Sequence, residues 1–394
     1  MSDTQFPLLL RSLIQDTPPE STAPWDIPAL WKTAAEQSLL PVLAYENKRW
    51  RLFDDADVCR RLDGLLYSAV AGNLNRCVDF EALSKRFTEQ GIAHMPVKGY
   101  YLRRLYPVSG LRTFGDIDLL IHPEDRAKAH ALMCALGYTV GHDWEPTYSY
   151  VRDTEYYEIH TNLMDGNLDG RTDLPAYFGR AWQYAERDDG LRYRPAPEFH
   201  FIYTVCHLAK HLYGGGAGLR MYLDAALFVK QEDARLDWAA IMEEFSALHM
   251  TAFFHTVMNA CRVWFGTETV CPLPEPDHAA LEKLLDYTLD ADLFGLSRDH
   301  AVIELGGCAV ERPRAAADAL SSGGRDRDAL HIFEGTALAA SGRVDRAAVC
   351  QSAPDPGAAA PDEAGHQNGQ GAGGGLRQLH ARNRTLTAGR HMEK

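Results

Sequence analysis

The sequence has no long hydrophobic run and no closely paired cysteines. No uninterrupted apolar stretch approaches the roughly 18 residues that a membrane helix needs, so no membrane partner is expected. The start, Met1-Ser2-Asp3, has no basic leader before its short apolar patch and does not resemble a signal peptide. The eight cysteines are scattered without a Cys-x-x-Cys pair, which argues against a zinc ribbon and a disulfide framework. We therefore expect a reduced, cytoplasmic protein.

Positive charge is also scarce. The 394 residues include 40 Lys and Arg against 54 Asp and Glu, a formal net charge of −14. Because affinity for nucleic acid comes mainly from basic side chains that neutralise phosphates, we do not expect binding to long DNA. A local basic site remains compatible with this balance. The apolar fraction of 46% and the length predict a globular protein of two or three domains.

Aromatic residues are nearly absent from the last quarter of the chain. All of them except Phe333 lie at or before residue 294, and the sequence from about Gly306 is rich in Ala, Gly, Arg, Asp and Pro. Such a composition offers too little apolar area to offset the conformational entropy of folding, so we predict a disordered tail over 306–394. It is either a natural tail or the product of a shifted reading frame. We expect no chemistry in it.

The rest of the chain predicts an α+β fold. The first 91 residues carry helical patterns, for example over 27–37 and 54–90. Residues 92–196 predict a small mixed sheet with short helices, and residues 197–305 a carboxy-terminal helical domain. The strands are expected at residues 92–97, 117–121, 138–140, 149–152 and 156–162, with helices at 100–106 and 123–136.

The strongest local signal for chemistry is Gly115-Asp116-Ile117-Asp118. In a strand, residues two apart point to the same face, so Asp116 and Asp118 should project together while Ile117 faces the other way. Two neighbouring carboxylates repel one another unless a cation lies between them. Oxygen ligands of this kind suit Mg²⁺, or the similar Mn²⁺.

A second strand repeats this arrangement with Glu158 and His160. If that strand lies beside the first, Glu158 becomes a third carboxylate in the cluster. Three carboxylates can hold two divalent ions about 4 Å apart, as in two-metal phosphoryl-transfer sites. His160 would then line the same site.

Basic and small residues precede the acidic motif. Lys98 and Gly99 follow the first predicted strand and begin a helix, where backbone N–H groups can approach a phosphate and the helix dipole favours an anion. Arg112, four residues before Asp116, could add a further positive charge.

Together these motifs resemble a bacterial family of uncharacterised nucleotidyltransferases within the DNA polymerase β-like superfamily. The resemblance rests on Lys98-Gly99-x-x-Leu102, on the segment from Arg112 to Leu120, and on Glu158-Ile159-His160. It covers roughly residues 30–270. It implies a nucleotidyltransferase core that moves a nucleoside monophosphate from an NTP, ATP above others, to an acceptor and releases pyrophosphate. The acceptor is a protein, an RNA or a small molecule that the sequence does not name.

The resemblance also implies roles for individual residues. Asp116 and Asp118 would be metal ligands, and Glu158 would be either the third ligand or the base on the acceptor hydroxyl. The nucleotide would contact Lys98, Gly99, Arg112, Gly115 and His160. In one respect the sequence departs from the superfamily, because Tyr100 stands where Gly or Ser usually follows Gly99. The alternative is therefore a catalytically degenerate module that binds a nucleotide or a protein partner.

A later helical segment contains His207, Lys210 and His211. We expect these three residues to face the active-site cleft and contact the nucleotide. His207 and His211 have the i, i+4 spacing of a zinc site, but the Glu of His-Glu-x-x-His is missing, so a zinc hydrolase is the weakest alternative. Asp224 is expected to pair with Arg220 on the next helix.

Overall fold

The computed structural model describes residues 5–168, 172–214, 216–290, 304–305 and 308–309. The expected tail therefore lies outside the described residues, apart from the short strand β9. Residues up to Arg312 belong to one compact unit, and residues 313–394 are assigned to a second.

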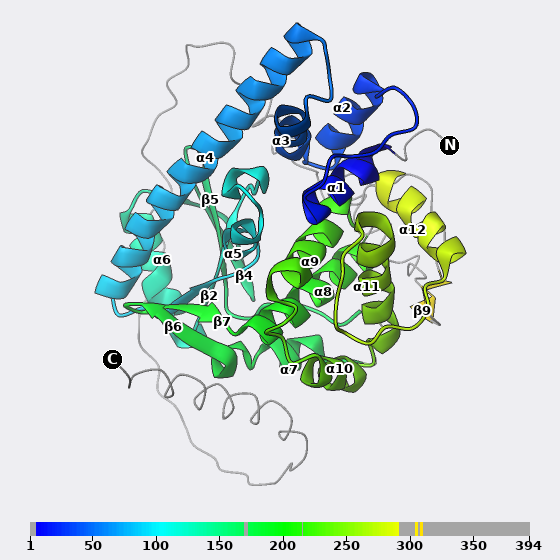
Figure 1. The fold of residues 1–394 in the computed structure, drawn as a ribbon. Coiled ribbons are helices and arrows are strands. Elements are labelled where there is room, and N and C mark those ends of the chain that lie inside the picture. The colour runs from blue at the N-terminus through cyan, green and yellow to red at the C-terminus, as the bar shows by residue number, and fades with distance from the viewer. Residues whose placement is uncertain (1–4, 169–171, 215, 291–303, 306–307, 310–394) are drawn as a thin grey trace, which may run out of the picture. The chain divides into compact units, whose positions relative to one another are not determined.

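Four helices precede the sheet (Figure 1). The carboxylate of Asp26 caps α2, and that of Asp55 caps the long α4 by accepting hydrogen bonds from backbone N–H groups of the first turn. Soon after α4 ends, Gly91 takes a φ of +69°, a conformation that glycine adopts without a Cβ clash. These helices are α1 (Gln5–Gln15), α2 (Ile27–Glu36), α3 (Leu40–Trp50) and α4 (Ala56–Glu89).

A seven-stranded mixed sheet forms the centre, in the order β3-β4-β5-β2-β1-β7-β6. The pairs β2–β5 and β1–β7 are parallel, and the other neighbours are antiparallel. The expected α+β class with a small mixed sheet is therefore confirmed. The strands are β1 (His94–Pro96), β2 (Ile117–Ile121), β3 (Thr139–Trp144), β4 (Thr147–Arg152), β5 (Glu155–His160), β6 (Ala185–Asp189) and β7 (Arg192–Pro195).

The hairpin β6–β7 was not predicted. Its strands are short and rich in charged residues, with Asp188 and Asp189 near the turn, so the sequence carries no clear alternation of apolar and polar residues. Pairing of β7 with β1 nevertheless extends the sheet by two strands.

Two apolar clusters cover the two faces of the sheet. On one face, Ile117, Leu119 and Ile121 of β2 join Phe80 of α4 and Met133 of α6 (Arg126–Ala135). On the other face, Leu120 of β2 and Met95 of β1 join the main cluster with the carboxy-terminal helices. Figure 1 shows α4 and α6 apart from α8, α9 and α11. The carboxy-terminal helices are α8 (Pro197–Gly214), α9 (Leu219–Glu232), α10 (Trp238–Ala247), α11 (Thr251–Phe265) and α12 (His278–Asp290).

Short elements join these layers. The pairing of β8 with β9 replaces helix at the end of the segment that was expected to be helical through 305. The remaining elements are α5 (Gly99–Leu102), α7 (Leu174–Phe178), the 3₁₀ turns at Arg103–Leu105, Ser109–Leu111, Pro123–Asp125 and Ala181–Tyr184, β8 (Glu304–Leu305) and β9 (Cys308–Ala309).

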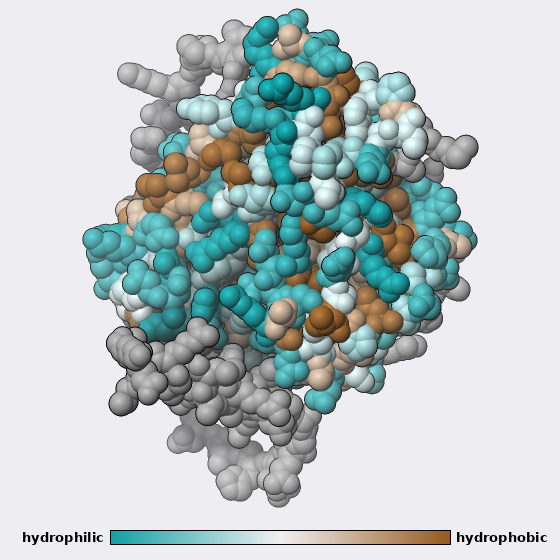
Figure 2. All heavy atoms as spheres, viewed as in Figure 1, coloured by the Kyte–Doolittle hydropathy of each residue, from teal (hydrophilic) through white to brown (hydrophobic). Residues whose placement is uncertain are grey.

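None of the helices in the described part of the chain is both long and apolar enough to cross a membrane. Figure 2 shows hydrophilic side chains over much of the visible face, with apolar side chains scattered between them.

Candidate nucleotidyl-transfer site

The centre of the site is a row of polar side chains across β2 and β5. The parallel register places Asp118 directly opposite Glu158, and Leu120 opposite His160. Because residues two apart share a face, Asp118 points away from the apolar face of Ile117 and Leu119. The alternation predicted for this strand and the pairing assumed for Glu158 are both present.

Asp118 is almost fully buried and accepts two hydrogen bonds on one oxygen. Lys98 Nζ lies 2.6 Å from Asp118 Oδ1, and His160 Nε2 lies 2.9 Å from the same atom. Burial alone would raise the pKa of Asp118, but the Lys98 ammonium and His160 hold it well below its usual range. Asp118 is therefore a permanent negative charge at physiological pH.

The other two carboxylates behave differently. Burial, followed by the negative charge of Asp118, raises the pKa of Glu158 to about 7. Burial and Asp118 also raise the pKa of Asp116, which lies just before β2 and is half-buried. Crowded carboxylates with raised pKa values are the electrostatic signature of a site that gains from a bound cation.

The donor set fits a divalent metal ion. Asp118, Glu158 and His160 each offer one ligand atom, and these atoms lie within 4.8 Å of one another. Two carboxylates suit Mg²⁺ or Mn²⁺, and the imidazole favours Mn²⁺ of the two. Asp116 is not in this group, and its role as a ligand stays a prediction. His160, expected to contact the nucleotide, lies within the acidic cluster itself.

Lys98 and Gly99 lie where β1 leads into α5. Lys98 has φ 48° and ψ −124°, a strained conformation for a residue other than glycine. A Cβ on Gly99 would lie 2.6 Å from Arg112 Nη1 and 3.0 Å from Phe114 Cβ, so the close packing of these two side chains favours glycine at this position. Gly115, by contrast, has no atom within 4 Å of such a Cβ. Because α5 has only four residues, its dipole contributes little to phosphate binding.

Arg112 makes a buried ion pair behind the site. Its Nε and Nη2 lie 2.8 Å from the two carboxylate oxygens of Asp224 on α9, and Tyr106 donates to the same carboxylate. The expected pairing of Asp224 with Arg220 is wrong, because Arg112 meets the carboxylate in a bidentate geometry. Contact between Arg112 and a nucleotide stays a prediction, but the structure gives its guanidinium a structural partner.

A polar stripe of α8 faces the acidic cluster. His207 Nε2 lies 3.3 Å from His211 Nε2, and burial followed by the charge of Lys98 lowers the pKa of both rings, that of His211 to about 4. Both imidazoles are therefore neutral near pH 7. Lys210 lies beside them but its Nζ is 2.6 Å from Asp165 Oδ1. Among the described residues, no third His, Cys, Asp or Glu is grouped with these two imidazoles at metal-binding distance.

Three further residues also adjoin the site, among them Arg220, which was expected only as the partner of Asp224. Arg76 of α4 donates to the carbonyls of Phe114 and Gly115, directly before Asp116. Arg220 of α9 donates to the carbonyl of Thr113 at 3.1 Å. These two cations border Asp116 from opposite helices, and each lies at a sequence distance that no local motif could reveal.

The third is Tyr203, one turn before His207 on α8. It is buried, and its hydroxyl has no hydrogen-bond partner within the described residues. Burial, opposed by the charge of Lys98, raises the pKa of its phenol. Its hydroxyl is available for a ligand at the acidic cluster.

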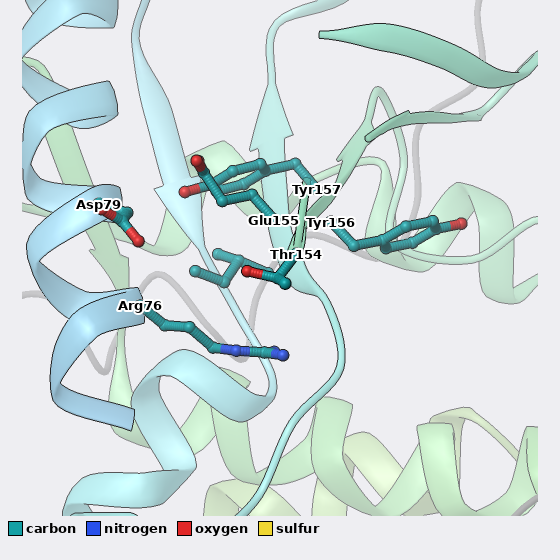
Figure 3. A pocket seen from close by; sticks show the side chains of 7 residues that line it. Arg76, Asp79, Thr154, Glu155, Tyr156 and Tyr157 are labelled. Atoms are coloured by element: carbon teal, nitrogen blue, oxygen red, sulfur yellow. The ribbon is translucent and has the colours of Figure 1, made fainter. Parts of the chain in front are cut away.

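Arg76 also borders a small hollow at the start of β5 (Figure 3). The side chains of Arg76 and Asp79 on α4 lie across from Thr154, Glu155 and Tyr157. Tyr156 points in the opposite direction from Tyr157, toward the face of Glu158. The hollow thus lies on the apolar side of the sheet, away from the acidic cluster.

Comparison with known proteins agrees with this geometry. A mixed sheet that carries paired carboxylates beside a strand–turn–helix connection defines a nucleotidyltransferase-like protein. Residues 23–266 match the model of a family described as uncharacterised nucleotidyltransferase, and the chain belongs to that family. Searches of the curated proteins and of the solved structures gave no match. The family match supports a role in nucleotidyl transfer from an NTP.

Proposed function

We propose that this protein transfers a nucleoside monophosphate from an NTP, preferably ATP, to an acceptor hydroxyl with the aid of Mg²⁺ or Mn²⁺. The observation that carries the proposal is the side-by-side placement of Asp118 and Glu158 on parallel strands, with His160 in the same cluster. Membership of the nucleotidyltransferase family supports the same reaction. Asp118 and Glu158, with Asp116 beside them, would hold the metal.

The metal would neutralise the α-phosphate and lower the pKa of an attacking hydroxyl. The acceptor oxygen forms a bond to the α-phosphorus as the bond to the bridging oxygen breaks, and pyrophosphate leaves with that electron pair. Glu158 would serve either as a metal ligand or, where it does not bind the metal, as the base that takes the hydroxyl proton, because burial and Asp118 raise its pKa to about 7. Asp118, with its lowered pKa, remains ionised throughout.

The remaining predicted residues surround this centre with donors for phosphate. Lys98 supplies a buried ammonium, and His207 and His211 supply neutral imidazoles from α8. Lys210 adds a charge at the rim, and the open backbone at Gly115 leaves room for a close approach, whereas Arg112 and Phe114 fill the space beside Gly99. We assign Arg112 to support of the loop before Asp116 rather than to direct phosphate contact, because Asp224 occupies it.

Calorimetric titration with each of the four NTPs in Mg²⁺ tests the proposal without knowledge of the acceptor. Binding should require the metal and should be lost in Asp118→Asn and strongly weakened in Asp116→Asn. Asp63→Asn is the matched control, since Asp63 is exposed and pairs only with Lys48. Unchanged, metal-dependent NTP binding in Asp118→Asn would contradict the proposal.

One observation favours the degenerate alternative. The Lys98 ammonium already lies 2.6 Å from Asp118 and neutralises the carboxylate without a metal. A module of that kind would bind a nucleotide or a protein partner equally well with EDTA present. Transfer of the label from α-labelled NTP to protein, RNA or small-molecule fractions, with release of unlabelled pyrophosphate, separates the two functions.

A further inference from the structure

Trp144, on the edge strand β3, is unusually exposed. Its side chain is 65% exposed, and no other tryptophan of the chain is among the exposed large apolar residues of the described part. His142 lies beside it, with ring centroids 4.6 Å apart and planes tilted by 33°. An exposed indole with a second aromatic ring beside it offers a surface on which a planar ligand can stack.

The strand register places Trp144 on the same face of the sheet as the acidic cluster. Trp144 lies opposite Thr147 of β4, and Thr147 lies opposite His160 of β5. Directly opposed residues point to the same face, and Thr147 Oγ1 lies 3.1 Å from His160 Nδ1 across that pair. Trp144, Thr147 and His160 therefore form one row that ends at the metal ligands.

The separation along this row suits a nucleotide. Strand β3 lies two strands from β5, and neighbouring strands are about 4.8 Å apart, so the backbone of Trp144 lies about 10 Å from that of His160. A nucleotide whose phosphates bind at the carboxylates extends its sugar and base away from them by a comparable length. The indole lies where such a base would end.

The edge strand is poorly suited to the other obvious occupant, an added peptide strand. The register of β3 against β4 shifts between Val140 and Asp143, a bulge that interrupts the edge. The charged pair of Asp143 with Arg126 lies on the opposite face of the strand. Both features disfavour pairing with another chain.

We propose that Trp144, with His142 beside it, is the platform on which the base of the NTP stacks. This inference rests on the proposed function, because the phosphates of the same ligand are placed at Asp118 and Glu158. An aromatic platform accepts any base, since every base has a π-face, so binding of all four NTPs should depend on it. Stacking on one aromatic side chain is worth about 1–3 kcal/mol per base.

The test compares ATP with inorganic tripolyphosphate, which has the phosphates but no base. In Mg²⁺, Trp144→Leu should bind ATP about 5- to 150-fold more weakly by calorimetry, the equivalent of one lost stack. Its affinity for tripolyphosphate should equal that of the original protein. Trp144→Tyr should retain most of the ATP affinity. Binding of ATP should quench tryptophan fluorescence less in Trp144→Leu than in the original protein.

Tyr67→Leu is the matched control, because Tyr67 is also an exposed aromatic residue and lies on α4. Equal ATP affinity of Trp144→Leu and the original protein would overturn the inference, and so would parallel losses for ATP and tripolyphosphate. The inference would also be overturned if Trp144→Leu bound a short oligoribonucleotide more weakly but ATP as tightly as the original protein, because the platform would then belong to the acceptor. If the original protein binds neither ATP nor tripolyphosphate, the proposed function itself fails.

Discussion

Lys98 combines an unfavourable backbone conformation with a buried charge. A positive φ at a residue other than glycine costs on the order of 1–3 kcal/mol, and such strain persists where the surroundings hold the residue in place. Here the conformation directs the ammonium onto Asp118 Oδ1. The Lys98 ammonium therefore contacts the same oxygen of Asp118 that a divalent cation would bind. Metal binding must displace the ammonium from this oxygen or move it toward a phosphate.

We therefore expect Lys98→Met to bind Mn²⁺ more tightly, by about tenfold or more, because a positive charge close to the ligands is removed. The same variant should bind NTP more weakly, since it has lost a phosphate donor. Titration of Mn²⁺ followed by electron paramagnetic resonance measures the first effect. Lys48→Met is the control, as Lys48 is an exposed residue that pairs with Asp63. Unchanged or weaker Mn²⁺ binding in Lys98→Met would be inconsistent with this role.

The residues of the acidic row could be predicted because their signal is local. A strand of five residues carries its own alternation, so the faces of Asp118 and Ile117 follow from spacing alone. The partner of Arg112 could not be predicted in this way. Asp224 lies 112 residues later, and only the packing of α9 against the loop before β2 brings the two together.

At the scale of elements, Arg76 connects the long helix α4 to the turn that presents Asp116. Its donation to the carbonyls of Phe114 and Gly115 fixes the backbone next to the carboxylate. We expect Arg76→Met to lower the free energy of unfolding by about 1.5–3 kcal/mol, the range for a hydrogen bond from a charged donor. It should also weaken metal-dependent NTP binding. Urea unfolding and calorimetry test the two effects, with Arg60→Met on the exposed side of the same helix as control.

A lower stability with unchanged NTP binding would show that Arg76 supports the fold without positioning Asp116. The residue escaped prediction because an arginine within a helical pattern looks like part of a solvated face. Only the position of α4 across the end of β2 reveals its partners. Strands β6 and β7 escaped prediction for the same reason, because their place in the sheet comes from pairing with β1 and not from their own residue pattern.

The pair of Arg112 and Asp224 joins the sheet layer to the carboxy-terminal helices. Both side chains are buried, so removal of one leaves an uncompensated charge. We expect Arg112→Met to destabilise the protein by about 3–5 kcal/mol, and the double variant Arg112→Met/Asp224→Leu to recover much of that loss. Urea unfolding of the single and double variants measures the coupling. The double variant leaves the Tyr106 hydroxyl without its acceptor, so part of the loss should remain; a double variant no more stable than either single variant would contradict a direct coupling between Arg112 and Asp224.

At the scale of the whole molecule, the central sheet contains a histidine that links folding to pH. His94 of β1 is fully buried, its Nδ1 lies 3.1 Å from the carbonyl oxygen of Ile92, and its Nε2 lies 2.7 Å from Ser84 Oγ. Burial lowers the pKa of His94 to about 4, and the charge of nearby Arg192 opposes protonation as well. The hydrogen bonds fit the neutral ring, with Nδ1 as donor and Nε2 as acceptor from the serine hydroxyl.

The direction of the pH dependence follows from proton binding in the two states. The unfolded chain binds a proton at His94 below about pH 6.5, whereas the folded protein does so only below about pH 4. The contribution of neutral His94 to stability is therefore complete above pH 6.5 and decreases as the pH falls from 6.5 to 4. The full difference is about 3 kcal/mol.

We expect urea unfolding to show this decrease in the free energy of unfolding between pH 7 and 4. The His94→Gln variant should lose the part of the pH dependence that comes from His94, because an amide offers a donor and an acceptor but does not titrate. His249→Gln, at a left-handed turn residue on the surface, is the control for the substitution itself. An identical pH profile in His94→Gln and the original protein would place the acid sensitivity elsewhere. If the prediction holds, neutral His94 contributes to the stability of β1, the strand that leads into Lys98, and acid removes that contribution.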